Sequence, residues 1–331
     1  MKKIISIGLI LTMLAAGAAW AEAPKETAEP LVPLLDLPEL ESGVIAELPV
    51  EQDGAQAFYP PREENYLYED GETDPVGYAD PSITVNLGRG RIYDTNYIYA
   101  RVKIASPTQL RGMLASPVTS SHTTPGHDLA KRVQAVLAVN GDFCGGDNNS
   151  KGALMRQGKM LRLKCDAKYD ILVIDRAGDF HILLNARTTE IEAMADDAVN
   201  IFTFGPGLVI DGTPQYGLRL GRIASHKPAQ RVALCQTGPL EYLVLTSEGP
   251  ENPGSVGLTL EQFVDLVSSI PGVQNAYNLD GGSSATLVFR RDGNNWRKIN
   301  ALSSSKVRPL KDIIYFASAW DTEADGAKGE D

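Results

Sequence analysis

The stretch "NLDGGSSATLVF", Asn278–Phe289, joins two apolar segments through a polar turn. The run "VQNAY" leads into the turn, and "TLVF" follows it. Gly281 and Gly282, at the centre of the turn, allow positive φ angles and a close approach of other backbone. The stretch therefore predicts a strand, a tight turn and a second strand, and it raises the question of whether the turn also holds a ligand.

The polar side chains of this turn suit an anion or a sugar phosphate. Ser283 and Ser284 place hydroxyl groups beside backbone N–H groups, a combination that can form an anion-binding nest. Asp280 repels a phosphate, so its presence indicates a general acid, a nucleophile or a metal ligand. A purely structural turn, in which Asn278 and Asp280 bond the local backbone, has the same composition. These residues alone leave both interpretations open.

A second apolar strand pattern ends in similar residues. The segment "AVLAVNGD" runs into Asn140, Gly141 and Asp142. Carboxylates from separate strands are a common way to assemble acid–base chemistry, so we expect Asp142 and Asp280 to share one site. Glu248 lies near the end of the predicted strand "EYLVLTSEG" and is a further candidate carboxylate.

Short strand patterns recur from Tyr66 onward, whereas helical patterns are few. Strands are predicted in "SITVNL", "YIYARVKI", "AVLAV", "YDILVID", "FHILL", "FTFGPGLVID", "RVALCQ", "EYLVLTSEG" and "DIIYFASAW". The clearest helix, "LTLEQFVDLVSSI", places its apolar residues on one face and ends at Pro271-Gly272. We predict an α+β fold, with a single domain around a mixed β-sheet and a few flanking helices.

The composition limits the possible partners. The chain has 331 residues, 43% of them apolar, and a formal net charge of −11. Nucleic acids and anionic membranes both require a basic face, so an acidic surface argues against them. A local basic pocket for a small phosphorylated ligand remains compatible with this charge.

The first 21 residues have the pattern of a signal peptide. Lys2 and Lys3 precede an apolar run, and Ala19-Trp20-Ala21 fits the small-x-small cleavage rule. A membrane anchor is the alternative, but the small-residue exit and the lack of a second apolar run favour cleavage. We expect a mature protein that begins near Glu22, is secreted or held in the periplasm or cell envelope, and has no membrane span.

Composition also divides the rest of the chain. Residues 22–65 are rich in Pro, Glu and Ala, so we expect a disordered spacer that folding does not require. Residues 66–320 form the predicted domain, and residues 321–331 form an acidic tail that we also expect to be disordered.

Three cysteines remain in the mature chain: Cys144, Cys165 and Cys235. An exported compartment permits disulfides, but three thiols cannot all pair within one chain. Cys144 and Cys165 bracket a loop and a short apolar segment, which makes them the better candidate pair. Three buried thiols are the alternative.

Several of these blocks together resemble the phosphodiester glycosidase family, to which the lysosomal uncovering enzyme belongs. In chain order they are "AVNGDF", "GALMRQGKM", "FTFGPGLVIDG", "RVALCQ", "GLTLEQFVDLV" and "AYNLDGGSSATLVF". Members of the family cleave a sugar from a phosphodiester at the glycosidic bond. The resemblance implies an exported hydrolase that acts on a sugar-1-phosphodiester in a cell-surface or extracellular glycan, such as an exopolysaccharide.

Carried over residue by residue, the resemblance implies a site built from both loops and two arginines. Asp280 and Asp142 are the implied catalytic carboxylates, and Glu248 is a substitute for either. Arg231 and Arg308 suit a phosphate because a guanidinium binds its oxygens in a bidentate manner. The sequence requires no cofactor and does not identify a metal. The implied substrate-binding residues are Asn140, Gly141, Arg231, Asn278, Gly281, Gly282, Ser283, Ser284 and Arg308.

Two departures from the family pattern favour alternatives. The family usually has a further serine where this chain has Ala285, and many members have Asp-Gly-Arg where this chain has Ser247-Glu248-Gly249. A non-catalytic surface protein that binds a glycan or a sugar phosphate is the first alternative. An enzyme of the same fold that processes peptidoglycan or teichoic acid is the second, and it rests on the phosphodiesters that wall polymers contain instead of on these departures.

Overall fold

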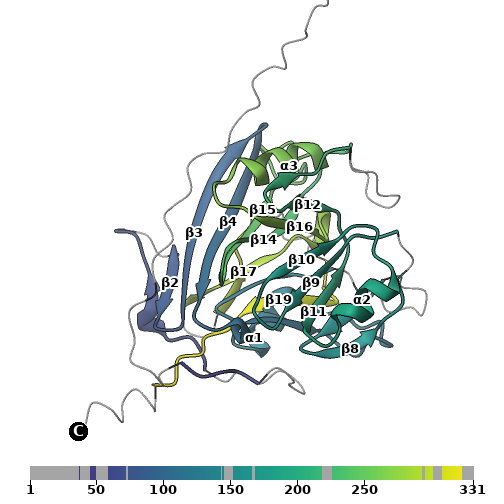
Figure 1. Ribbon diagram of the computed structural model, residues 1–331. Helices are drawn as coiled ribbons and strands as arrows, with labels where there is room; N and C mark the ends of the chain where they lie inside the picture. The colour runs from purple at the N-terminus through teal and green to yellow at the C-terminus, as the bar shows by residue number, and fades with distance from the viewer. Residues whose placement is uncertain are drawn as a thin grey trace, which may run out of the picture.

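Three antiparallel sheets organise the chain (Figure 1). The computed structural model describes residues 37, 45–49, 59–71, 74–142, 144, 152–165, 168–217, 226–292, 295–300 and 308–322. The predicted signal peptide and residues 323–331 of the predicted tail lie outside these ranges.

The largest sheet has nine strands and extends from β2 and β3 on the left of the molecule to β12 near its upper centre (Figure 1). In spatial order they are β1 (Tyr66–Leu67), β2 (Gly77–Asp80), β3 (Ile83–Ile92), β4 (Thr95–Ile104), β15 (Glu241–Ser247), β14 (Val232–Gly238), β16 (Asn275–Leu279), β12 (Gly207–Ile210) and β13 (Thr213–Pro214).

The two smaller sheets have five strands each. One has the order β10 (Phe180–Leu183), β9 (Ile171–Asp175), β11 (Ala198–Thr203), β7 (Leu154–Arg156) and β8 (Lys159–Arg162). The other has the order β18 (Asn295–Lys298), β17 (Leu287–Asp292), β6 (Leu137–Asn140), β19 (Asp312–Phe316) and β5 (Leu110–Leu114).

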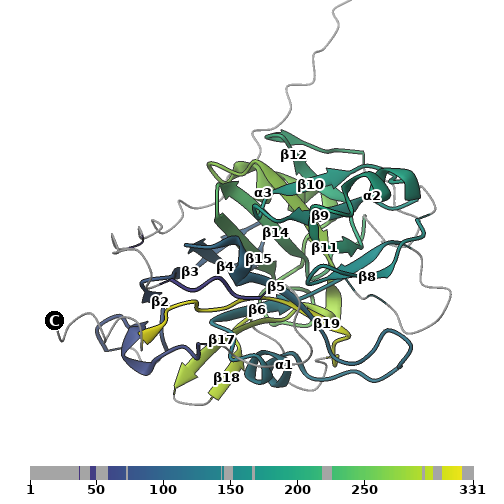
Figure 2. The same ribbon diagram turned by 60° about the horizontal axis from the view of Figure 1, so that its bottom comes forward.

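Strands dominate, and the described helices are short. These are α1 (Gly126–Arg132), α2 (Thr188–Met194) and α3 (Leu260–Ser269), with 3₁₀ turns η1 (Glu63–Asn65), η2 (Pro107–Gln109) and η3 (Gly282–Ser284). The predicted helix corresponds to α3, whose N-cap Thr259 accepts a hydrogen bond from the backbone N–H of Gln262. Figure 2 shows α1 beside β17 and β18, below β6 and β19. The α+β prediction therefore holds only broadly, because the fold is mainly β.

The prediction of a mixed sheet is wrong for the strands described. Each of their pairings is antiparallel. Strand direction depends on which distant segments pair, and a pattern of short apolar runs does not contain that information. The strand predictions themselves are confirmed, since each quoted segment contains or overlaps a strand.

The turn after Leu279 carries the chain from one sheet to another. Strand β16 lies in the nine-stranded sheet, whereas β17, which begins at Leu287, lies in the sheet of β6 and β19. The polar turn therefore lies at the junction of two sheets.

Strand β14 is buried on both faces, because its alternating side chains pack in two different apolar clusters. Val232 and Leu234 pack in the cluster shared by the three sheets, and Ala233 and Cys235 pack beneath α3.

Part of the predicted spacer packs on the folded chain. Leu48 is 2% exposed, and its backbone N–H donates to Thr108 Oγ1 at 3.1 Å. The buried Arg111 donates from Nη2 to the carbonyl oxygen of Pro49 at 2.8 Å. Tyr59 forms a β-bridge with Ser318. These contacts correct the expectation of disorder for residues 45–49 and 59–65, and they argue that folding uses this segment.

Replacing Leu48 with alanine should lower the free energy of unfolding by about 2 kcal/mol, because a buried isobutyl group is lost. The same change at Leu184, which is 49% exposed, should have almost no effect. Urea denaturation of both variants measures the difference. Equal stabilities would show that the segment around Leu48 does not contribute to the fold.

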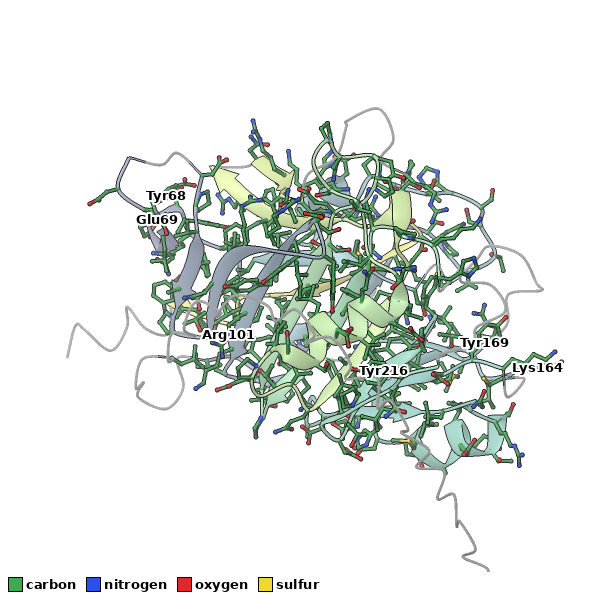
Figure 3. All side chains as sticks on the ribbon, turned by 90° about the horizontal axis from the view of Figure 1, so that it is seen from above. Tyr68, Glu69, Arg101, Lys164, Tyr169 and Tyr216 are labelled. Atoms are coloured by element: carbon green, nitrogen blue, oxygen red, sulfur yellow. The ribbon has the colours of Figure 1, made fainter. Side chains whose placement is uncertain are left out.

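The exposed apolar side chains are dispersed over the surface. The large ones among the described residues are Tyr68, Leu184, Tyr216 and Val256. Figure 3 shows Tyr68 and Tyr216 well apart, and single exposed apolar residues are normal for a folded protein. Within the described ranges, no helix is both long and apolar enough to cross a membrane.

Candidate active site

The turn that follows β16 has a conformation that requires its glycines. Gly282 has a φ of +57°, and a Cβ atom at Gly281 would lie 2.5 Å from the carbonyl oxygen of Gln230. The backbone N–H of Gly282 donates to that same oxygen at 2.9 Å. The turn therefore packs closely against Gln230, which precedes β14. This contact fixes the position of Asp280.

The structure brings the two predicted loops together. The side chain of Asn140 donates from Nδ2 to the carbonyl oxygen of Asp280 at 2.6 Å, and its Oδ1 accepts the backbone N–H of Thr286 at 3.0 Å. The backbone N–H of Asp280 donates to the carbonyl oxygen of Gly141 at 3.3 Å. Asn140 thus holds both ends of the turn, so its amide supports the site instead of projecting into solvent.

Asp280 forms the accessible centre of the site. Arg308 Nη2 donates to Asp280 Oδ2 at 2.6 Å, and Arg308 Nε donates to Ser284 Oγ at 2.7 Å. The side chain of Asp280 is 14% exposed and that of Arg308 is 44% exposed. Burial raises the pKa of Asp280 above its ordinary value, although Ser284 and Arg308 act in the opposite direction. The result is a carboxylate, a guanidinium and a hydroxyl group within direct contact.

A small pocket joins this cluster to a residue that the sequence did not indicate. Its lining residues are Asn140, Gly141, Asp280, Ser284, Pro309, Leu310, Lys311 and Asp312. Asp312 is the first residue of β19, which lies next to β6. The pocket thus connects the loop after β6, the turn after β16 and the start of β19.

Asp142 is enclosed by protein groups. Its side chain is 1% exposed, Oδ1 accepts Arg156 Nη2 at 3.0 Å, and Oδ2 accepts the backbone N–H of Thr203 at 2.7 Å. Arg156 Nη2 also donates to Asp312 Oδ2 at 2.6 Å. A carboxylate bound on both oxygens does not fit the catalytic role that the resemblance implied, and we reassign Asp142 to a structural role.

Sequence reasoning missed Arg156 and Asp312. Arg156 is fully enclosed, with its guanidinium carbon 3.9 Å from the centroid of the Phe202 ring. Its Nη1 donates to the carbonyl oxygens of Met155 and Ile201. The available signal was a single charged residue at the edge of a buried strand in each case, "LMR" for Arg156 and "DIIYF" for Asp312.

The pH dependence of stability should report on Asp312. Burial and repulsion from Asp142 raise its pKa to about 7, against the attraction of Arg156. The unfolded chain releases this proton near pH 4, whereas the folded chain keeps it up to about pH 7. The stability that Asp312 contributes is therefore complete below about pH 4 and is lost as the pH rises through about 7.

Urea denaturation of the wild type and of Asp312→Asn between pH 4 and pH 8 measures this contribution. The wild type should lose more stability than the variant across that range. Parallel profiles would show that Asp312 is ionised throughout. Arg156, Asp142 and the Cys144 thiol are the other ionisable groups of this cluster.

The same cluster has one feature of a metal site. The ligand atoms of Asp142, Cys144 and Asp312 lie within 4.8 Å of one another. Arg156 already contacts both carboxylates, and burial raises the pKa of the Cys144 thiol, which favours its protonated form. A metal would have to displace a guanidinium and deprotonate a buried thiol, so the cluster fits an arginine better than a metal.

The predicted Cys144–Cys165 disulfide is not supported. Cys144, Cys165 and Cys235 are all buried thiols, which was the alternative. Cys165 and Cys235 pack among apolar side chains in separate clusters. A small apolar thiol suits such positions without oxidation.

Two predicted binding residues support neighbouring backbone. Arg231 directly precedes β14, whose first residue pairs with Leu279 at the end of β16, but its Nε and Nη2 donate to the carbonyl oxygens of Leu258 and Lys227. Burial lowers the pKa of Arg231 to about 10. Asn278 donates from Nδ2 to the carbonyl oxygen of Gly205 at 2.8 Å. Both residues lie near the site, and neither has a described contact with Asp280.

Glu248 belongs to a separate polar cluster. Its Oε2 accepts Ser255 Oγ at 2.6 Å and Asn96 Nδ2 at 3.1 Å. It follows β15, two strands away from β16 in the sheet order. Ala285, at the other departure from the family pattern, is fully buried. A serine hydroxyl there would face the interior in this chain, so that departure does not remove an exposed donor.

Comparison with known proteins agrees with the sequence blocks. The model of the phosphodiester glycosidase family matches residues 133–317, more than half of the chain. This range contains both loops, Arg156, Arg308 and Asp312. No curated protein sequence matches the chain.

Two solved structures have a similar fold. The catalytic domain of zebrafish N-acetylglucosamine-1-phosphodiester alpha-N-acetylglucosaminidase, auto-inhibited by its pro-peptide, is 16% identical, with a TM-score of 0.58. The match covers 84% of this chain and 99% of that one. A hypothetical protein from Synechocystis is 17% identical, with a TM-score of 0.51, and the match covers 72% of this chain and 62% of that one. At these identities the likeness shows the fold alone. The family match over more than half of the chain shows that the chain belongs to the phosphodiester glycosidase family.

Proposed function

We propose that this protein is an exported hydrolase that cleaves the glycosidic bond of a sugar linked through a phosphodiester, in a cell-surface or extracellular glycan. Family membership supports the reaction class. The observation that carries the proposal is the contact of Asp280 with Arg308 and Ser284 at a partly exposed turn. The reaction needs one carboxylate for the positive charge on the sugar and two hydrogen-bond donors for the phosphate.

Arg308 and Ser284 act on the phosphate in this proposal. The bond between the anomeric carbon and the phosphate oxygen breaks, and the phosphate monoester leaves with the bonding electrons. The guanidinium and the hydroxyl stabilise the charge that develops on the leaving oxygen. Because phosphate is a good leaving group, a strong general acid is not needed at this step.

Asp280 acts on the sugar. Its ionised carboxylate stabilises the positive charge that develops at the anomeric carbon. Water then adds to that carbon and releases its proton to Asp280 or to solvent. The Arg308 guanidinium, which lies 2.6 Å from Asp280 Oδ2, offsets the repulsion between this carboxylate and the anionic substrate. The raised pKa of Asp280 favours proton acceptance from water.

A sugar-1-phosphodiester with a chromogenic aryl group on the phosphate tests the reaction: glycosidic cleavage releases the aryl phosphate, from which an added phosphatase then frees the chromophore, whereas cleavage of the aryl P–O bond frees the chromophore directly. In water enriched in ¹⁸O, cleavage at the glycosidic bond places the label in the sugar, whereas attack at phosphorus places it in the phosphate. Label in the phosphate would replace this proposal with a phosphodiesterase.

Replacing Arg308 with glutamine should lower kcat/KM for the phosphodiester by about ten- to a hundredfold, because a charge-assisted contact with phosphate is lost. Arg89→Gln is the matched control, since Arg89 is exposed on β3, several strands from β16. Steady-state kinetics of both variants measure the effect. Equal kcat/KM values would remove Arg308 from phosphate recognition.

A non-catalytic glycan- or sugar-phosphate-binding protein is the second candidate. The observation that favours it is Glu248, which lies where many family members have the residues Asp-Gly-Arg and is bonded to Ser255 and Asn96. Calorimetry with a sugar-1-phosphate separates the two functions. Binding without turnover of any sugar-1-phosphodiester supports the second.

The exported location rests on the first 21 residues alone. N-terminal sequencing of protein recovered from the cell envelope or the medium tests it. A chain that begins near Glu22 supports export with cleavage, and an intact Met1 supports the membrane anchor.

A further inference from the structure

Asp312 contacts the loop after β6 through both backbone and side chain. Its carbonyl oxygen accepts the backbone N–H of Gly141 at 3.2 Å, and its Oδ2 accepts the backbone N–H of Asp142 at 3.3 Å. A Cβ atom at Gly141 would lie 1.9 Å from Asp312 Oδ2. The loop therefore lies directly on the Asp312 carboxyl group, and only glycine fits there.

The other side of the same loop holds Asp280. The carbonyl oxygen of Gly141 accepts the backbone N–H of Asp280 at 3.3 Å, and Asn140 Nδ2 donates to the carbonyl oxygen of Asp280 at 2.6 Å. Gly141 thus has Asp312 on one side and Asp280 on the other. A single residue, Gly141, therefore links Asp312 to the backbone of Asp280.

Arg156 forms a buried ion pair with Asp312. Its Nη2 lies 2.6 Å from Asp312 Oδ2 and 3.0 Å from Asp142 Oδ1, and all three side chains are at most 4% exposed. Arg156 is on β7, Asp312 is on β19 and Asp280 follows β16, so the three residues come from three different sheets. The cluster connects these sheets at the site.

We propose that Asp312 is a positioning residue, which holds Asp280 in its working position through Gly141. The proposal rests on the proposed function in treating Asp280 as the catalytic carboxylate. The Asp312 side chain itself is 2% exposed, and its described contacts are with Arg156 and the loop after β6.

Two substitutions separate the contacts of Asp312 from its charge. Asp312→Asn removes the charge but keeps an oxygen that accepts hydrogen bonds from the backbone N–H of Asp142 and from Arg156 Nη2. Asp312→Ala removes the charge and both contacts. Gly141→Ala is a third variant, which keeps every charge and pushes the loop away from Asp312. It serves as the test if Asp312→Ala does not fold.

Carbon-13 NMR of the aspartate carboxyl groups provides a readout without substrate. The Asp280 signal is assigned from the spectrum of Asp280→Asn. Asp312→Ala and Gly141→Ala should shift the titration of Asp280 well beyond the shift in Asp312→Asn. In kinetics on the sugar-1-phosphodiester, kcat should fall about tenfold or more in these two variants, with KM nearly unchanged. Asp312→Asn should stay within about threefold of the wild type, as a rescue by a conservative change.

The outcomes distinguish this proposal from the proposed function. If Asp312→Ala folds and has the same Asp280 titration and the same kcat as Asp312→Asn, the positioning role is overturned. If the Asp280 titration shifts in Asp312→Ala but even the wild-type protein shows no turnover, the proposed hydrolase is overturned and the positioning role is supported. A fall in stability alone, with Asp280 and kcat unchanged, would leave Asp312 a purely structural residue and also overturn it.

Discussion

Replacing Asp280 with asparagine should lower kcat by a factor of about 10² or more, as expected for the loss of a positioned charged group. The amide keeps the size of the side chain and removes the charge that stabilises the anomeric carbon. Stability should change little, because the partner Arg308 is 44% exposed and ion pairs at such positions contribute little. Kinetics and urea denaturation of one variant test both statements.

Glu248→Gln is the matched comparison for Asp280→Asn. Glu248 is the other partly exposed carboxylate that the sequence indicated, and it is bonded to Ser255 and Asn96, away from Arg308. It should retain kcat within about threefold. If a well-folded Asp280→Asn protein keeps full activity while Glu248→Gln loses it, the carboxylate at work is Glu248.

The pH profile of kcat adds a second test of Asp280. Burial raises its pKa, and the role proposed here needs the ionised form. Activity should therefore fall as the pH decreases through that raised pKa, at a higher pH than for an ordinary aspartate. A general-acid role predicts the opposite, with activity lost as the pH rises through the same pKa.

Replacing Arg156 with methionine should destabilise the protein by about 3–5 kcal/mol, the usual cost of removing one partner of a buried ion pair. The change removes the guanidinium that both Asp142 and Asp312 contact, and it leaves two buried carboxyl groups beside each other. Arg89→Met, on the exposed face of β3, is the control and should have almost no effect. Urea denaturation at pH 7 measures both.

The loss of stability in Arg156→Met should depend on pH. At low pH Asp312, whose pKa is raised by burial and by Asp142, is protonated and no longer repels Asp142, so the difference from the wild type should decrease. Adding Asp142→Asn to the variant should recover part of the stability at pH 7 for the same reason. A loss below about 1 kcal/mol at every pH would mean that solvent or another group compensates the charges.

Local rules were sufficient for the ends of the strands that form the site. Apolar runs that stop at Asn140 and Leu279 marked β6 and β16, and Gly281 and Gly282 marked the turn between β16 and β17. Glycine conformation and strand alternation act over a few residues, so a single sequence contains them in full. The resemblance to the phosphodiester glycosidase family rested on these same blocks, and the family match confirms it.

Tertiary structure decided which of the predicted site residues are accessible. Asp142 and Asp280 have the same local pattern, a carboxylate next to glycine after a strand, yet Asp142 is closed in by Arg156 and Thr203. The packing of residues 45–49 depends in the same way on a distant partner, because the carbonyl oxygen of Pro49 meets Arg111. A proline-rich composition does not show whether such a partner exists.

The family, most of the strands and the turn that carries Asp280 follow from the amino-acid sequence, because each depends on neighbouring residues in the chain. The antiparallel strand pairings and the location of β16 and β17 in different sheets depend on contacts between distant segments, which the folded structure shows. The folded structure also shows that Arg156 and Asp312 meet beside Gly141. These two residues are 156 positions apart, and the pairing of distant charges is set by the register of packed sheets, which no local pattern encodes.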